Sequence, residues 1–277
     1  MKRSMLAVWV WYRGDRFRGF QRQVQGPTVQ GELARALTEL GLASGAAPAG
    51  RTDLGVHARM QVVGVRVPRD LEPGELAERL GKRLPEGLGL CLAVRPPRRF
   101  HPQWRCAGKE YRYRLTLGAA PRGWKPFAWD VSSAPRLEGR SPRPEQVDEL
   151  LRASVGRRDF QSFHEKTSAI GPRTLSEARL VEVGPGLFEA RLRGDRFGRY
   201  QVRYLVGSAV AAAAGVIGRE AFAAALDEGA KLEGLKAPGQ GLVLWEVFYP
   251  PEDDPFTAGE RAAPPGLPDE PPFSTVR

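Results

Sequence analysis

The chain has 277 residues, the length of one large domain or two modest ones, and its composition is that of a globular protein. Hydrophobic residues make up 42% and charged residues 27%, which excludes a wholly disordered, collagen-like or membrane-spanning chain. Cys91 and Cys106 are the only cysteines, and neither they nor the three histidines have the spacing of a metal site. We therefore expect a protein of the cytoplasm with reduced thiols, no metal and no membrane span.

The formal net charge is +10, and it is unevenly distributed. Residues 250–277 contain six acidic and two basic side chains, a net charge of −4, so the rest of the chain carries +14. Basic and aromatic residues alternate in three stretches, 2–22, 95–114 and 191–203. A solvated strand face would explain each stretch alone, but the three together favour a polyanionic partner such as nucleic acid.

Hydrophobic periodicity predicts strands alternating with helices along the chain. The expected strands are 5–12, a short one before Gly50, 60–67, 88–94, 111–117, 173–183, 187–193 and 242–249. The expected helices are 28–40 with Thr28 as its N-cap, 71–84, 144–155, 199–216 and 219–228.

The order of these elements approximates β-α-β-β-α-β twice, which predicts an α+β fold with two ferredoxin-like or RNA-recognition-like lobes of antiparallel sheet. We place the N-terminal lobe at residues 1–104 and the C-terminal lobe at 105–250. Residues 251–277 are acidic and rich in proline, which predicts a disordered tail.

The segment 50–58 is the best candidate for chemistry, because it sets Asp53 two residues from Arg51 between two glycines. Glycine allows sharp turns and the close approach of a ligand. The segment has no second acid, and the chain has no Gly-x-Ser-x-Gly pattern and no phosphate-binding glycine loop. Asp53 is therefore expected to act as a nucleophile or proton-transfer group without a cofactor, the alternative being a turn that it merely caps.

Residues 50–53, 55–57 and 61–63 together closely resemble the active-site segment of the TruA family of tRNA pseudouridine synthases. Further matching segments follow the family order over about residues 5–250: 19–23, 28–30, 100–102, 109–113, 159–163, 173–174, 197–208 and 241–242. The chain departs from the family at Leu54, where a small or polar residue is usual, and at 201–204, where Met-Val-Arg-Asn is commoner. Neither departure removes a group that the chemistry needs.

The resemblance implies that the protein isomerises uridine to pseudouridine at positions 38–40 of the anticodon stem-loop of tRNA. It implies a flipped target base and no cofactor. By resemblance Asp53 is the nucleophile, Arg203 its ion-pair partner, and Tyr111 the residue that stacks on the base and assists proton transfer. The residues expected to bind substrate are Tyr111, Arg51, Leu242, Arg22 and Gln21.

Several of these residues have alternative interpretations. Arg51 would otherwise form a structural salt bridge, Arg203 would contact a phosphate or solvent, and Leu242 would be an ordinary core leucine. For His57, loop-stabilising hydrogen bonds are favoured over a role as general base. Tyr113 is expected in the core, on the face of its strand opposite Tyr111.

The resemblance also implies a homodimer that holds tRNA across both subunits. Its two lobes would join into one central sheet with helices on one face and a basic active-site cleft between them. One rival hypothesis is a non-catalytic tRNA-binding protein of the same fold, with Leu54 blocking the pocket. The retention of Asp53, Tyr111 and Arg203 argues against it. A second rival, an unrelated cofactor-free hydrolase, is disfavoured by the matches spread along the chain.

Overall fold

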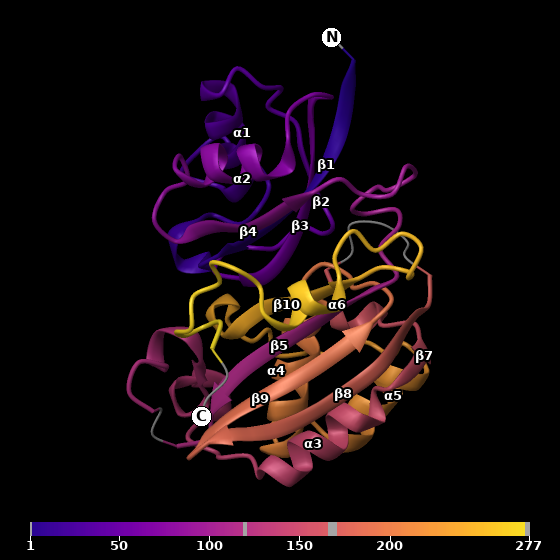
Figure 1. Cartoon of the computed structure of the whole chain (residues 1–277). Helices are drawn as coiled ribbons and strands as arrows, with labels where there is room; N and C mark the ends of the chain where they lie inside the picture. Colours follow the sequence, from indigo (N-terminus) through magenta and orange to yellow (C-terminus); the bar gives the residue numbers. More distant parts are fainter. Residues whose placement is uncertain (1, 119–120, 166–170, 275–277) are drawn as a thin grey trace. The chain divides into compact units, whose positions relative to one another are not determined.

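The computed structural model describes residues 2–118, 121–165 and 171–274 (Figure 1). The chain forms two compact units. Unit 1 comprises residues 1–107 and 244–273, and unit 2 comprises residues 108–243 and the end of the chain from Ser274. The first boundary thus falls at Ala107 instead of residue 104, and the chain returns to unit 1 at Leu244.

Unit 1 contains an antiparallel sheet with β1 at its centre. β1 pairs with β3 on one side and with β4 on the other, and β2 pairs with the far edge of β3. The spatial order is therefore β4-β1-β3-β10, where residues 244–248 of β10 (Leu242–Phe248) belong to unit 1, and the short β2 also pairs with β3. The order along residues 3–94 is β-α-β-β-α-β. The elements are β1 (Arg3–Tyr12), α1 (Val29–Glu39), β2 (Ala46–Pro48), β3 (His57–Pro68), α2 (Pro73–Gly81), β4 (Leu88–Val94) and α6 (Ala258–Ala262).

The predicted start of α1 is confirmed at Thr28. Its side-chain oxygen accepts a hydrogen bond from the backbone N–H of Gly31 at 3.2 Å, which satisfies one of the amides left open at a helix N-terminus. Leu33 and Leu37 recur on one face of the helix and are buried. The cap and this apolar stripe are the reasons that the segment is helical.

The strands of unit 2 pair antiparallel in the order β5-β9-β8-β7, with the two-residue β6 parallel to β5. Helix α3 packs on β8 and on α4, and α4 also contacts α5 and β5, so the three helices form one layer (Figure 1). The elements are β5 (Gly108–Thr116), β6 (Trp129–Asp130), α3 (Pro144–Ala153), β7 (Gly156–Arg158), β8 (Arg173–Gly184), β9 (Leu187–Gly194), α4 (Gln201–Ala213), α5 (Arg219–Asp227) and β10 (Leu242–Phe248), whose first two residues belong to unit 2 and the rest to unit 1.

The predicted disorder of residues 251–277 is wrong for the described part, 251–274. Phe256 and Phe273 are buried, and their rings meet Trp9 and Trp11 of β1 edge to face. Arg261 pairs with both carboxylate oxygens of Asp254 at 2.8 Å. The few aromatic residues of a proline-rich segment thus find buried positions on unit 1; the last three residues lie outside the described part of the chain.

The predicted mixed α+β class is confirmed. Cys91 is a free, buried thiol, and burial raises its pKa to about 12, so it is an unreactive core residue. Among the described residues, no helix is both long and apolar enough to cross a membrane.

Candidate active site

Asp53 lies on the loop between β2 and β3, and the backbone of this loop is fixed at both ends. The Ala49 N–H donates to the Val62 carbonyl at 2.8 Å, and the Val56 N–H donates to the carbonyl of Asp53 itself at 3.1 Å. Between them, the Thr52 carbonyl accepts from the Phe20 N–H at 3.0 Å. The loop is therefore held by one hydrogen bond within itself and by two other segments of unit 1, β3 and the segment that contains Phe20.

A buried polar cluster of Tyr12, Thr52 and Gln61 supports the loop. The hydroxyl groups of Tyr12 and Thr52 lie 2.7 Å apart, and the Gln61 amide donates to the Gly50 carbonyl at 2.6 Å and to the Tyr12 hydroxyl at 3.4 Å. Burial raises the pKa of Tyr12 to about 12, partly offset by hydrogen bonds from Thr52 and Gln61. Tyr12 is consequently a neutral hydroxyl that connects the end of β1 to the residue before Asp53.

The segment around residues 14–20 packs closely against the loop. The Gly14 N–H donates to Nδ1 of the fully buried His57 at 2.9 Å, which confirms the expected loop-stabilising hydrogen bond. A Cβ on Gly14 would lie 2.4 Å from the Val56 backbone, so only glycine fits there. Gly19 has φ +94°, and its Cβ would approach the Thr52 carbonyl to 2.9 Å. Two of the segments that match the family thus meet at Asp53.

The side chains predicted to meet substrate in unit 1 are open to solvent, except that Asp53 is half-buried. Arg51 is exposed and forms no ion pair with any residue that the structure describes, which argues against the structural salt bridge. Gln21 and Arg22 are also exposed. Leu54 is 63% exposed, so its side chain does not fill the interior of the loop.

Tyr111 lies on β5 opposite Leu192, and its ring meets Phe197 edge to face with centroids 4.9 Å apart. Tyr113 is fully buried as expected, and its hydroxyl donates to the Pro238 carbonyl at 2.8 Å. Burial raises the pKa of Tyr113, so it is a neutral core residue. The prediction that it faces away from Tyr111 is wrong, because residues two apart on a regular strand share a face.

Arg203 lies in the first turn of α4, and Ala237, in the irregular segment before β10, fixes it. Its Nε donates to the Ala237 carbonyl at 2.7 Å, and its own carbonyl accepts from the Ala237 N–H at 3.1 Å. The guanidinium lies over the Tyr200 ring, 5.0 Å from the centroid. A Cβ on Gly207 would lie 2.0 Å from the Leu235 carbonyl, so α4 approaches this segment as closely as two backbones can.

Leu242 begins β10 and is 5% exposed. The preceding Gly241 has no room for a side chain, since its Cβ would lie 2.5 Å from the Arg114 carbonyl. Leu242 is therefore held in place by β5, and its burial is compatible with both a core role and a wall of the uracil pocket.

Tyr12 and Gln61 are the residues that sequence reasoning missed. Gln61 belonged to the matching motif without a role, and Tyr12 counted only as the end of a strand. The available signal was a glutamine followed by two valines, four residues beyond His57, the loop's last matching position. In the described parts of the chain, no group of three or more His, Cys, Asp or Glu residues could hold a metal ion.

Comparison with known proteins identifies relatives of this chain. The tRNA pseudouridine synthase A of Thermus thermophilus is 36% identical over 252 residues, which cover 87% of this chain and 95% of that protein. This chain belongs to the tRNA pseudouridine synthase family. The family model described as tRNA pseudouridine synthase matches residues 150–250.

Two other tRNA pseudouridine synthases A are similarly close. That of Roseiflexus sp. is 32% identical over 95% of this chain and 96% of its own length, and that of Neisseria meningitidis is 32% identical over 88% and 91%. A solved Cbf5–Nop10–Gar1 complex matches 74% of this chain and 44% of its own at 14% identity and a TM-score of 0.34. The family assignment rests on the sequence relatives. It confirms the predicted class, an isomerase, and excludes the unrelated hydrolase.

Proposed function

We propose that the protein isomerises uridine to pseudouridine in tRNA and that Asp53 is the group on which the reaction depends. The observation that carries the proposal is the construction of the Asp53 loop. A buried Tyr12–Thr52–Gln61 cluster and the Gly14–His57 hydrogen bond hold the one carboxylate of a segment that matches the family's active site. A rigid loop of this kind positions a reacting group better than a mobile one.

The reaction needs no reagent from outside. The C1′–N1 bond of the uridine breaks, the base turns, and a C1′–C5 bond forms; the proton on C5 leaves to solvent and N1 takes up a proton. Atoms and electrons balance without an oxidant or a reductant. A carboxylate beside the sugar or the ring can either bond covalently or assist departure of the base, and both routes require Asp53 to be ionised.

Two residues of unit 2 complete the proposed site. An ionised carboxylate in a water-poor pocket is costly unless a cation faces it, and we assign that role to Arg203. Arg203 is suited to it because Ala237 and Tyr200 already fix its side chain. We assign Tyr111 to stacking on the uracil, with its hydroxyl near C5, where it can assist removal of the proton.

The proposed substrate is the anticodon stem-loop, with uridines 38–40 as targets. A stacked base is inaccessible, so the target nucleotide must be flipped out. Arg51, Gln21 and Arg22 are exposed and available to grip the RNA around it, while Leu242 forms a wall of the pocket.

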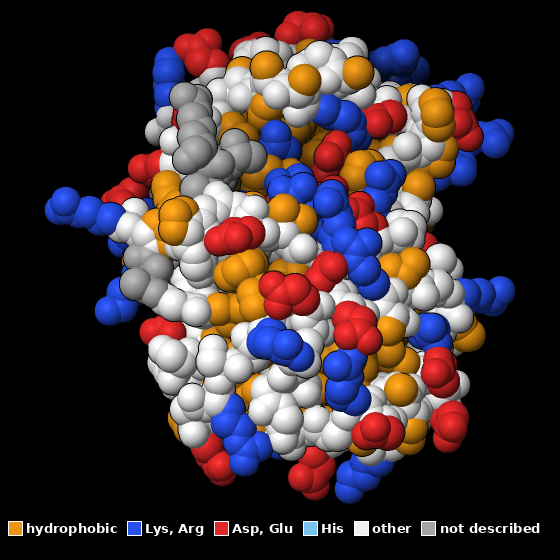
Figure 2. Space-filling view, turned by 90° about the horizontal axis from the view of Figure 1, so that it is seen from below, with side chains coloured by type: hydrophobic (Ala, Val, Ile, Leu, Met, Phe, Trp, Pro, Cys, Tyr) orange, Lys and Arg blue, Asp and Glu red, His pale blue; other side chains and the backbone are white. Residues whose placement is uncertain are grey.

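The proposal includes the assembly that the resemblance implies. In it the sheets of the two units join into one, with helices on one face and a basic cleft between the lobes, and the protein acts as a homodimer in the cytoplasm. The strongly basic sequence outside residues 250–277 supports an RNA partner. Figure 2 shows one face on which Lys and Arg side chains gather near the middle with acidic side chains among them.

The test is to incubate transcribed tRNA with the purified protein and map pseudouridine by carbodiimide modification and primer extension. We expect new stops at one or more of positions 38–40. Pseudouridine at other positions only would contradict the proposed substrate site. No pseudouridine from a folded protein that binds tRNA would support the non-catalytic alternative.

A further inference from the structure

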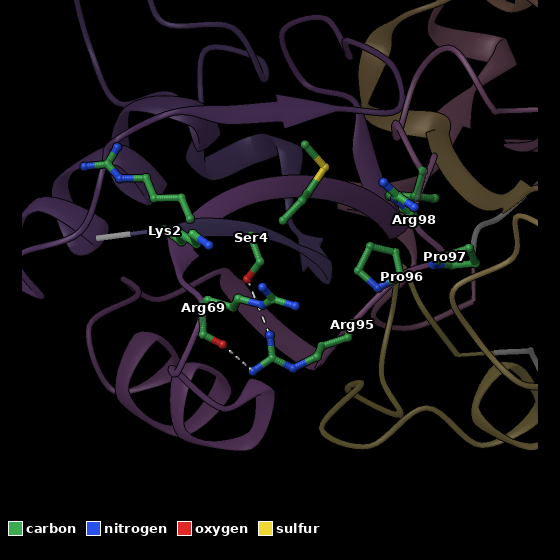
Figure 3. A pocket seen from close by; sticks show the side chains of 10 residues that line it. Lys2, Ser4, Arg69, Arg95, Pro96, Pro97 and Arg98 are labelled. Atoms are coloured by element: carbon green, nitrogen blue, oxygen red, sulfur yellow. Dashed lines mark hydrogen bonds between the residues drawn. The ribbon is translucent and has the colours of Figure 1, made fainter.

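A basic cavity of about 600 Å³ lies in unit 1 at the start of β1 (Figure 3). No acidic side chain lines it. Lys2 and Arg98 stand on opposite sides of the cavity, with Ser4 and Arg95 between them (Figure 3). The lining residues are Lys2, Arg3, Ser4, Met5, Arg69, Arg95, Pro96, Pro97, Arg98 and Phe100.

Arg95 forms the fixed part of this cavity. Its guanidinium donates to the carbonyls of Arg69 and Leu71 at 3.1 and 2.9 Å, to Ser4 Oγ at 3.4 Å, and to the Glu72 carboxylate at 3.1 Å. The Arg69 N–H in turn donates to the Lys2 carbonyl at 3.1 Å. The walls of the cavity are therefore tied together by protein hydrogen bonds before any ligand binds.

The other four basic side chains of the cavity are uncompensated. Within the described ranges, no ion pair involves Lys2, Arg3, Arg69 or Arg98. On the nearby helices, by contrast, Arg35, Arg79 and Lys82 all pair with glutamates at 2.6–2.9 Å. Four like charges around one cavity repel one another, and a bound anion would remove that cost.

The shape and chemistry of the cavity suit a phosphate of a nucleic-acid backbone. Exposed guanidinium and ammonium groups grip phosphate oxygens, and they do so regardless of sequence. A carboxylate-bearing peptide is a weaker candidate, since the basic net charge of the whole chain already indicates a polyanion.

The cavity is distant from the Asp53 loop. Ser4 and Tyr12 are eight residues apart on one strand, which at ~3.3 Å per residue is roughly 26 Å. Tyr12 contacts the residue before Asp53. A duplex rises ~3.4 Å per base pair, so roughly eight base pairs are needed to span this distance. The stem of a short stem-loop has fewer base pairs than that.

We propose that the Lys2–Arg69–Arg98 cavity binds backbone phosphates of tRNA outside the anticodon stem-loop. The protein would thereby distinguish a whole tRNA from an isolated stem-loop. This inference rests on the proposed function for the identity of the RNA. It adds a second point of contact to the catalytic loop. Phosphate contacts here would hold the RNA in register while carrying no sequence information.

The test compares the triple variant Lys2→Gln, Arg69→Gln, Arg98→Gln with a control variant that loses the same charge, Arg35→Gln, Arg79→Gln, Lys82→Gln. Binding of transcribed whole tRNA and of an isolated anticodon stem-loop is measured at several KCl concentrations. For whole tRNA, we expect the cavity variant to raise Kd by roughly tenfold or more and to lower the log Kd against log salt slope by about 2. For the stem-loop, we expect less than a twofold change.

The result that overturns the inference is a cavity variant that binds whole tRNA as tightly as the control variant does. An equal loss of affinity for the stem-loop would also overturn it, because the phosphates would then lie close to the target base. Pseudouridine formation by the unmodified protein is assayed in parallel. If the unmodified protein forms no pseudouridine while the cavity variant, unlike the control variant, loses affinity for tRNA, the proposed function fails but the proposed phosphate-binding role of the cavity stands.

Discussion

Tyr12 determines how Asp53 is presented, because its hydroxyl connects the end of β1 to Thr52, the residue before Asp53. Gln61 completes the arrangement by binding both the Tyr12 hydroxyl and the Gly50 carbonyl. The Asp53 loop is thus supported by buried, neutral hydrogen bonds, which are strong where water is excluded. We infer that Tyr12 acts through Asp53, as a positioning residue, because its buried hydroxyl is used in hydrogen bonds within the protein.

We expect Tyr12→Phe to lower kcat by roughly tenfold to a hundredfold through misplacement of Asp53, with tRNA affinity unchanged. The lost hydroxyl should also cost about 1 kcal/mol of unfolding free energy. The matched control is Tyr249→Phe, since the Tyr249 hydroxyl is likewise buried in unit 1 and donates to the Pro102 carbonyl at 2.8 Å. That variant should lose similar stability and keep its kcat. Equal kcat values for the two variants would contradict the positioning role.

The site shows which parts of a functional centre a sequence can predict. Motif spacing predicted the loop and Asp53, and the preference for a structural His57 was correct because its buried ring accepts a hydrogen bond from Gly14. The Tyr12–Gln61 contact could not be predicted. It joins residues 49 positions apart whose meeting depends on the register of β1 against β3.

At the scale of elements, α4 and the segment before β10 act together to hold Arg203. The close approach at Gly207 allows Ala237 to make two hydrogen bonds with Arg203, one to its side chain and one to its backbone. Any displacement of this segment should therefore move the guanidinium. A helix residue with no side chain thereby controls the position of a charged one a turn away.

We expect Gly207→Ala to lower the unfolding free energy by roughly 1–3 kcal/mol, because its Cβ would lie 2.0 Å from a backbone oxygen that must shift. Turnover at saturating tRNA should fall further than the population of unfolded protein explains. Gly81→Ala in α2, where the added Cβ meets nothing within 4 Å, serves as the control. It should leave stability unchanged or raise it by up to about 1 kcal/mol. The measurements are urea unfolding and turnover of both variants. A stable, fully active Gly207→Ala protein would contradict the proposed role of Gly207 in holding Arg203.

Long periodic elements were predictable and short irregular ones were not. The strand at 88–94 was predicted with its bounds, and the two hairpin strands around residues 184–186 were predicted to within one residue, because apolar alternation and a glycine turn mark them clearly. The three-residue β7 carries two arginines and no apolar stripe, so nothing in its sequence marked it. For α6 a signal existed: Thr257 and Glu260 form a capping box.

At the scale of the whole molecule, the acidic C-terminal segment is part of the fold of unit 1. Trp9 and Trp11 share one face of β1, and Phe256 and Phe273 pack against them. The acidic, proline-rich composition of residues 251–277 predicted disorder. A few aromatic anchors and the ion pairs of Arg261 nevertheless suffice to order the described part of this segment. Composition averages over a segment, whereas packing depends on single residues.

Removal of residues 251–277 is expected to lower the unfolding free energy by several kcal/mol, since two buried phenylalanines lose their contacts. Trp9, fully buried in the intact protein, should become accessible and shift its fluorescence to longer wavelength. Phe256→Ala with Phe273→Ala in the full chain should reproduce most of the loss, while exposed Glu252→Gln should change it by less than about 0.5 kcal/mol. An unchanged melting temperature and emission maximum after truncation would show that the segment adds no stability.

Transcribed tRNA that carries tritium at C5 of uridine tests directly whether isomerisation depends on Asp53. Formation of the C1′–C5 bond expels the label into water, so its release measures isomerisation alone. We expect release by the unmodified protein and none by Asp53→Ala or Asp53→Asn, both of which should remain folded and bind tRNA. Release by either variant at a rate near that of the unmodified protein would contradict the assignment of Asp53.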